Sequence, residues 1–274
     1  MKKIDEHGPV DKMRRCLNIL IIVLTVVAGT VSTQAAVSGS ASDEQIVSNA
    51  ELVASGTLFE IYQHGTRVDP AFLKIMERAY EQVQKVTGLT LDTATLGPKV
   101  HVYVSNSLGV SHVWRGYQHP RDPKGFIFLN SRVYRGALSG NNATYIHELT
   151  HLFTWKYRSH TLREGIADYV ALTILPGAAV GPNEGEAWSL SRIPSEVLEC
   201  LGTVKPIPVW VTTDPLRRSA YYFASYRFAK YLVERENFAT FMKLYASDDP
   251  ESDIKTLYGI SREEAVKAVF APRF

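Results

Sequence analysis

The sequence predicts an α+β fold, in which short strands precede two helices that carry neighbouring histidine and carboxylate side chains. Residues 99–104 and 125–130 are rich in β-branched and aromatic side chains, which is typical of strands. Residues 142–156 hold no glycine or proline and are typical of a helix. Beyond residue 217 the apolar residues recur at helical spacing. We therefore expect a first part with a sheet at residues 51–175 and a small helical subdomain at 176–274.

The remaining elements follow from local patterns. Alternation over residues 51–62 predicts one strand, and Asp69-Pro70 opens a helix that should run to residue 86. The stretch between the two later strands is expected to be a loop, and the Gly/Pro-rich residues 176–215 should hold one short helix at 194–201. Ser261 and Glu264 form a capping-box pattern. The expected C-terminal helices cover 217–235, 238–246, 250–258 and 261–270.

The segment His147-Glu148-Leu149-Thr150-His151 spells H-E-x-x-H within the helix predicted at 142–156. Residues four apart share one face of a helix, so the two imidazoles can bind one metal ion. Two neutral imidazoles leave tetrahedral positions on zinc for a third protein ligand and a water. Glu148 can reach that water as a general base. The alternative is a solvated helix face that matches the motif by coincidence.

A third ligand is expected on the next helical segment, after a turn at residues 158–160. Glu164 follows His151 by 13 residues, enough for the first helix to end and the chain to return. Asp168 lies one turn later on the same face, where its carboxylate can accept the free ring N–H of a zinc-bound histidine. Two plainer interpretations stay open. Thr161 and Glu164 also fit a capping box, and Asp168 also fits an exposed helix position.

These motifs, H-E-L-T-H followed by L-R-E-G-I-A-D-Y-V, resemble the gluzincin metallopeptidases, specifically the peptidase MA-like set with the pattern HExxH…EGxAxY. Residues 70–87 and 99–104 are similar to that family's first helix and central strand, and residues 222–232 to a later helix. The resemblance implies a zincin-like fold, a zinc ion and peptide-bond hydrolysis. The sequence departs from the pattern at Leu162, where a Trp-led pair is commoner, which leaves the local pocket wall open.

In the expected mechanism, His147, His151 and Glu164 bind Zn²⁺ and Glu148 moves a proton from water to the leaving amine. A hydrogen-bond donor should also face the oxyanion, because negative charge develops there only in the transition state. The resemblance to the family's later tyrosine makes Tyr222 the candidate, with Tyr221 and Tyr226 as rivals. A half-buried structural tyrosine is the alternative for each of them.

The substrate is expected to be a peptide or protein. If the strand at 125–130 is an edge strand, its free backbone groups can pair with an extended peptide, as the resemblance also implies. An ordinary buried strand is the alternative. The preceding loop carries aromatic side chains that either line a substrate cleft or pack internally. These are His112, Trp114, Tyr117 and His119.

The N-terminus has the pattern of an export signal. Basic residues precede an apolar run at 17–28, and Thr33-x-Ala35 fits a cleavage site. We expect a signal peptide at 1–35, with an uncleaved signal-anchor as the alternative, so membrane contact would come only through that anchor. Residues 36–50 are rich in small and polar residues and are interpreted as a flexible tether. The protein is therefore expected to be exported: periplasmic, secreted or in the cell envelope.

Charge and cysteine content exclude several classes. Removal of the export segment leaves 25 basic and 25 acidic residues, so nothing favours a nucleic-acid partner. Cys200 is then the only cysteine, which excludes an internal disulfide and a zinc–thiolate site. Two other functions stay open. One is a zinc-binding but inactive scaffold or receptor module of the envelope, and the other is a structural envelope protein whose motif is fortuitous.

Overall fold

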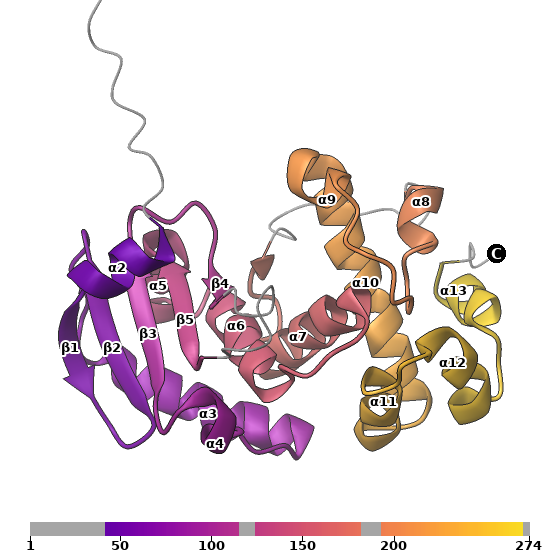
Figure 1. Ribbon diagram of the computed structural model, residues 1–274, viewed down its shortest axis with the longest axis horizontal. Coiled ribbons are helices and arrows are strands. Elements are labelled where there is room, and N and C mark those ends of the chain that lie inside the picture. The colour runs from indigo at the N-terminus through magenta and orange to yellow at the C-terminus, as the bar shows by residue number, and fades with distance from the viewer. Residues whose placement is uncertain (1–41, 115–123, 182–192, 271–274) are drawn as a thin grey trace, which may run out of the picture. The chain divides into compact units, whose positions relative to one another are not determined.

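The computed structural model describes residues 42–114, 124–181 and 193–270, and these contain helices and one five-stranded mixed sheet (Figure 1). The sheet has the strand order β1-β2-β3-β5-β4. Strands β2 and β3, and β3 and β5, run parallel, while both outer pairs are antiparallel. The strands are β1 (Glu51–Ser55), β2 (Phe59–His64), β3 (Val100–Ser105), β4 (His112–Val113) and β5 (Phe126–Asn130).

The single strand expected over residues 51–62 is wrong, because the chain turns back within it. Strands β1 and β2 form an antiparallel hairpin, and the backbone N–H of Gly56 donates to the carbonyl of Phe59 across the turn. The apolar alternation continues through this turn, so periodicity alone did not separate the two strands. Gly56 was the signal for the turn.

Of the two alternatives for the strand at residues 125–130, the edge strand is wrong and the interior strand is confirmed. Strand β5 lies inside the sheet, and the two-residue strand β4 pairs along its outer side. The backbone N–H of Trp114 donates to the carbonyl of Phe126, which extends the pairing by one further bond. A strand of two residues is too short to be recognised from periodicity. Among the described residues, the edge open to an added strand on this side is therefore β4.

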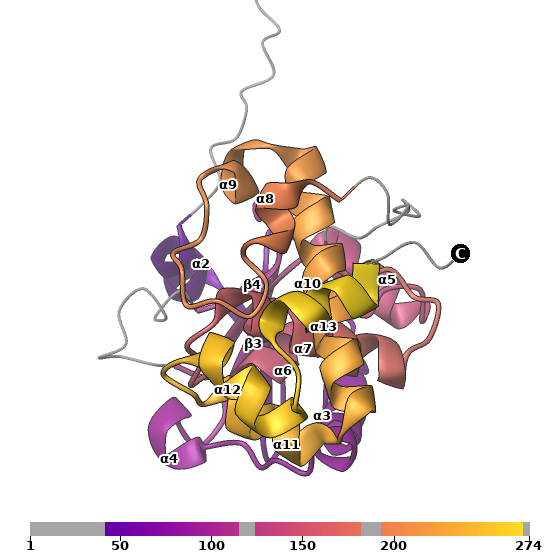
Figure 2. The same cartoon turned by 90° about the vertical axis from the view of Figure 1, so that its right-hand side faces the viewer.

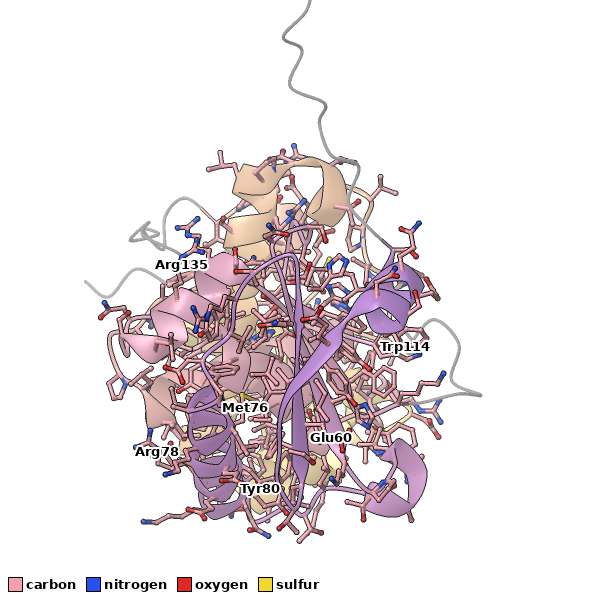
Figure 3. All side chains as sticks on the ribbon, turned by 90° about the vertical axis from the view of Figure 1, so that its left-hand side faces the viewer. Glu60, Met76, Arg78, Tyr80, Trp114 and Arg135 are labelled. Atoms are coloured by element: carbon pink, nitrogen blue, oxygen red, sulfur yellow. The ribbon has the colours of Figure 1, made fainter. Side chains whose placement is uncertain are left out.

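Apolar side chains pack on both faces of the sheet. One face packs against α3 (Phe72–Thr87), α5 (Ser131–Leu138) and α6 (Thr144–Phe153) in the main core. A smaller cluster of Ile46, Tyr103, Leu108 and Phe128 lies on the other face. In Figure 3, Met76 and Tyr80 lie along α3 and Trp114 lies across the sheet from them.

The tether expected at residues 36–50 is wrong where the structure describes it. Residues Asp43–Asn49 form helix α2, whose N-cap Ser42 and Gln45 make a capping box. Ile46 is fully buried in the smaller cluster. Small polar residues dominate this stretch. Its helix is stabilised by the Ser42 capping box and by the burial of Ile46. The expected signal segment and the rest of the tether lie outside the described residues.

The helices expected in the last third are confirmed. Helix α10 is the longest, and α11 to α13 gather beside it (Figure 2). The capping box of the last helix is present, since Ser261 and Glu264 bond each other's backbone N–H groups at 2.7 and 3.1 Å. The described residues of both predicted parts belong to one compact unit. The helices are α4 (Thr93–Leu96), α7 (His160–Ile174), α8 (Ser195–Leu198), α9 (Trp210–Thr213), α10 (Pro215–Arg235), α11 (Phe238–Tyr245), α12 (Pro250–Tyr258) and α13 (Arg262–Phe270).

Helices α7 and α10 pack closely at Gly165. A methyl group at this position would overlap the backbone carbonyl of Ser225 and the side chain of Ala229. Alanine normally favours a helix over glycine by about 1 kcal/mol, but here the overlap dominates. We expect Gly165→Ala to lower the free energy of unfolding by about 1–3 kcal/mol in urea titrations. The control Gly109→Ala has open space around it and should leave stability unchanged. Equal stability of the two variants would contradict this close packing.

No helix within the described ranges is both long and apolar enough to cross a bilayer.

Candidate metal centre

Helix α6 places His147 and His151 side by side. The side-chain oxygen of Asn142 accepts the Thr144 backbone N–H at 2.8 Å near the start of this helix. All ten residues of the helix are buried, so it is held on several sides. The two imidazole rings lie one turn apart with their centroids separated by 4.5 Å. The helix therefore places both rings close together on one of its faces.

After α6 the chain turns back and begins α7. The N-cap of α7 is not Thr161, the residue that the capping-box interpretation requires. Ser159 is the N-cap residue, and its hydroxyl faces the Leu162 backbone N–H. Thr161 lies inside the helix, where its hydroxyl accepts the Gly202 backbone N–H at 2.9 Å. The capping-box interpretation of Thr161 and Glu164 is therefore wrong. The Glu164 side chain instead faces α6.

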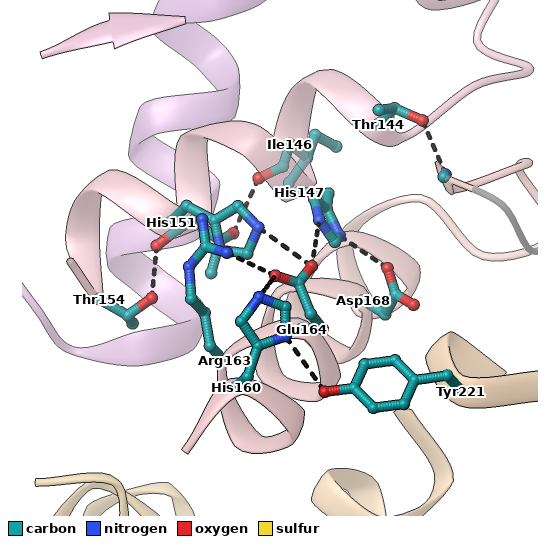
Figure 4. A network of polar contacts seen from close by, with 12 residues as sticks. Thr144, Ile146, His147, His151, Thr154, His160, Arg163, Glu164, Asp168 and Tyr221 are labelled. Carbon is teal, nitrogen blue, oxygen red and sulfur yellow. Dashed lines mark hydrogen bonds and ion pairs between the residues drawn. The ribbon is translucent and has the colours of Figure 1, made fainter. Parts of the chain in front are cut away.

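Glu164 converges with both histidines on one point (Figure 4). Its Oε2 atom lies 3.4 Å from Nε2 of His147 and 3.4 Å from Nε2 of His151. Both contacts exceed the usual N–H···O hydrogen-bond length of about 2.7–3.2 Å. Each of the three residues offers one possible metal-ligand atom, and these three atoms all lie within 4.8 Å of one another. This set is the cluster that could hold a metal ion, which we call the metal centre.

The other carboxylate oxygen of Glu164 has partners of its own. Oε1 accepts from Nη1 of Arg163 at 2.5 Å and lies 3.6 Å from Nε2 of His160. The Arg163 guanidinium also lies over the Tyr157 ring, 5.0 Å from its centroid. Burial alone would raise the pKa of Glu164, but the positive charge of Arg163 and the facing histidines hold that pKa well below its usual value. Glu164 is therefore ionised.

Asp168 contacts the first histidine. Its Oδ1 atom lies 2.7 Å from Nδ1 of His147, and its side chain is fully buried. An ionised carboxylate can only accept, so Nδ1 carries the proton and Nε2 is left to face Glu164. Burial would lower the pKa of His147, yet the charge of Asp168 and their hydrogen bond raise it well above its usual value. Asp168 is therefore not an exposed helix residue.

The second histidine has a different environment. Burial, followed by the positive charge of Arg163, lowers the pKa of His151 to about 3. Its Nδ1 atom is a buried ring nitrogen without a hydrogen-bond partner within the described part of the chain. His151 is thus neutral at pH 7.

Glu148 is buried beside this set, with 5% of its surface exposed. Burial raises the pKa of its carboxyl group, and the charge of Glu164 raises it further, while His147 opposes the shift. Among the described residues, no hydrogen bond or ion pair holds its carboxylate. It is thus the acidic group near the metal centre that remains free to bind a small polar molecule.

The two neighbouring tyrosines of α10 differ in their partners. The Tyr221 hydroxyl bonds Nδ1 of His160 at 3.1 Å, and its ring packs edge-on against Trp210. Tyr222 is partly exposed and packs against the core. Burial raises the pKa of Tyr222 well above its usual value, and the negative charges of Glu164 and Glu148 add to this. The Tyr221 hydroxyl is therefore occupied by its hydrogen bond to His160. The Tyr222 hydroxyl is influenced by the negative charges of Glu164 and Glu148. Tyr226 is partly exposed.

Two of the proposed cleft aromatics are used for packing. His112 stacks on Phe128 with 5.1 Å between centroids, and its Nε2 atom lies 2.9 Å from Oδ1 of Asp43. Trp114 packs edge-on against Phe126. Tyr117 and His119 lie outside the described residues. Leu162, where the sequence departs from the gluzincin pattern, is fully buried in the main core.

Around Glu164, sequence reasoning missed Arg163 and His160, and it considered Tyr221 only as a rival oxyanion donor and not as a partner of His160. His160 precedes Glu164 by one helical turn, so its position on the same face was a usable signal. Arg163 adjoins Glu164 in the chain, and adjacent helix residues usually point apart. Tyr221 is distant in sequence and gave no local signal.

The buried ionisable residues gather in this one place. Within the described ranges, every Asp, Glu, Lys, Arg or His side chain that is buried belongs to the metal centre or adjoins it. Such groups are rarely buried unless they are paired or functional. The six are His147, Glu148, His151, Arg163, Glu164 and Asp168.

No protein-family model matches this chain, and no curated protein matches it either.

Proposed function

We propose that the protein is an exported zinc metallopeptidase of the gluzincin type, with a zincin-like fold. One observation carries the proposal: Oε2 of Glu164 lies 3.4 Å from Nε2 of both His147 and His151. Zinc bonds of about 2.0–2.2 Å in a tetrahedron place neighbouring donor atoms about 3.3–3.6 Å apart. The two donor pairs that include Oε2 therefore already have the separation that a shared zinc ion requires.

The chemistry and charge of the site also suit zinc. Two imidazoles and one carboxylate form a ligand set used by catalytic zinc sites. Three buried carboxylates, Glu148, Glu164 and Asp168, surround the centre, and one buried guanidinium, that of Arg163, opposes them. An imidazole must be neutral to bind a metal, so in the zinc-bound state the excess would be two negative charges, which one divalent cation balances.

Each residue then has one task. His147, His151 and Glu164 would hold the zinc, and Asp168 orients the first imidazole through Nδ1. Bound zinc supplies a Lewis acid that polarises the scissile carbonyl and acidifies a water molecule. Glu148 accepts a proton from that water and passes it to the leaving amine. Tyr222 donates its hydroxyl proton in a hydrogen bond to the developing oxyanion.

The substrate class that fits this reaction is a peptide or a protein. The export signal that supports a periplasmic, secreted or envelope location lies at residues 1–35, outside the described part of the chain. Membrane attachment would come only from retention of that segment. The neutral balance of charge in the remaining chain gives no support for a nucleic-acid partner.

Metal analysis combined with a peptide-library digest tests the proposal. We expect one zinc ion per purified chain, cleavage of library peptides, loss of cleavage after treatment with a chelator, and recovery when zinc is returned. A metal-free protein that takes up no added zinc would contradict the proposal. So would cleavage that continues unchanged after complete removal of the metal.

Removal of Asp168 should weaken zinc binding without removing a zinc ligand. In Asp168→Ala, Nδ1 of His147 loses the 2.7 Å hydrogen bond that fixes its tautomer. Loss of such a partner costs about 10–100-fold in metal affinity, which we expect in chelator-competition titrations. Asp253→Ala on α12 is a matched control, because among the described residues that carboxylate accepts a hydrogen bond from the Ser247 hydroxyl and has no contact with the metal centre. Zinc affinity unchanged in Asp168→Ala would contradict the orienting role.

A further inference from the structure

The metal centre has a second layer on the side away from the histidines, formed by His160, Arg163 and Tyr221. Arg163 bonds Oε1, the oxygen of Glu164 that does not face His147 and His151, and His160 lies 3.6 Å from the same atom. Tyr221 reaches this oxygen only through His160, whose Nδ1 atom it bonds (Figure 4). We infer that these residues clamp Oε1 so that Glu164 offers zinc a single oxygen, Oε2. This inference rests on the proposed function and concerns positioning residues rather than catalytic ones.

Arg163 makes the strongest contact of the clamp. Its guanidinium bonds Oε1 at 2.5 Å, and its position over the Tyr157 ring holds it from a second direction. A hydrogen bond between two ionised groups is about twice as strong as a neutral one. The carboxylate is thereby held in one orientation before zinc arrives. Without this contact, the side chain would be free to rotate about its terminal bond.

His160 and Tyr221 complete the clamp from α7 and α10. The neutral imidazole carries one proton, and the negative charge of Glu164 favours that proton on Nε2, which faces Oε1 at 3.6 Å. Nδ1 is then an acceptor, and the Tyr221 hydroxyl donates to it at 3.1 Å. Trp210 packs edge-on against the Tyr221 ring. The C-terminal helices therefore contribute to the zinc site without supplying a ligand.

The clamp has a consequence for metal affinity. The positive charge of Arg163 repels a cation, which by itself would weaken zinc binding. Its orientation of Glu164 works in the opposite direction, because partners of a ligating carboxylate typically change metal affinity by about 10–100-fold. Since Oε1 separates the guanidinium from the metal position, we expect orientation to dominate.

Zinc affinity of the folded protein, measured by competition with a chromophoric chelator, tests the clamp. We expect Arg163→Met to bind zinc about 10–100-fold more weakly than the wild type. Arg163→Lys keeps the charge and one donor and should recover part of the loss. Tyr221→Phe should weaken binding about fivefold, as loss of one neutral hydrogen bond does.

Two controls separate the clamp from general effects on stability. Within the described part of the chain, the guanidinium of Arg218 bonds only the backbone carbonyls of Val211 and Thr212, so the zinc affinity of Arg218→Gln should equal that of the wild type. Tyr222→Phe removes the adjacent tyrosine and should lower turnover with unchanged zinc affinity. Thermal unfolding of each metal-free variant records folding independently.

The possible outcomes are distinct. A wild type that binds no zinc overturns the proposed function. A wild type that binds zinc together with an equally tight, folded Arg163→Met variant overturns the clamp alone. If Arg163→Met does not fold, Arg163→Lys and Tyr221→Phe decide, and wild-type affinity in both overturns the clamp.

Discussion

Glu148→Gln should abolish most peptide cleavage while leaving zinc in place. The amide cannot accept the proton of the attacking water, and loss of a general base costs about 10²–10⁴-fold in turnover. Glu148 does not belong to the three-residue set whose donors converge, so the zinc content should equal that of the wild type. Turnover of a library-derived peptide and zinc content, measured on the same preparation, provide the test.

The control for this variant is Glu234→Gln, an exposed carboxylate that pairs with Lys230 on α10. It removes the same charge from the chain at a distance from the metal centre and should keep full activity. Wild-type turnover in Glu148→Gln would remove Glu148 from its role. A wild type that binds zinc but cleaves no peptide would favour an inactive zinc-binding module instead.

Glu164→Gln should have the largest combined effect, on both metal binding and stability. The variant loses the charged oxygen that faces both histidines, so we expect zinc affinity to fall by more than about 100-fold, beyond the usual loss for an orienting partner. It also leaves the buried guanidinium of Arg163 without its counter-charge. We expect the free energy of unfolding of the metal-free protein to fall by about 2–4 kcal/mol.

A double variant separates these two effects. Arg163→Met combined with Glu164→Leu replaces the buried ion pair by apolar side chains of similar size, which is often neutral for stability. The double variant should therefore unfold near the wild-type urea midpoint and, like Glu164→Gln, bind zinc more than about 100-fold more weakly than the wild type. Tight zinc binding by either variant would show that Glu164 is not a ligand. Unchanged stability of Glu164→Gln would show that Arg163 does not depend on it.

The sequence predicted those parts of the fold whose signals are local. Helix α3 follows Asp69-Pro70 and ends at Gly88, which adopts the left-handed conformation that glycine favours. Helix α6 has an unbroken helical composition, and α13 has a complete capping box. The positions of His147, His151 and Glu164 followed from the H-E-x-x-H spacing and the length of one turn between helices. In each case residues close in sequence determine the geometry.

Elements that depend on distant partners were missed. Strand β4 is two residues long and exists because β5 offers it an edge. Helix α2 needs the sheet face beneath Ile46, since its composition alone is that of a tether. The contact of Tyr221 with His160 joins residues 61 positions apart, and no local pattern encodes it. Sequence therefore predicted the three residues that converge but not the side chains around Oε1 of Glu164.

Anomalous diffraction from crystals grown with zinc tests the central claim most directly. Data collected above and below the zinc absorption edge should show one strong peak bonded to Nε2 of His147, Nε2 of His151 and Oε2 of Glu164, with an open position towards Glu148. Zinc-loaded crystals with no peak among these three atoms, or with zinc bound only at surface residues, would contradict the account.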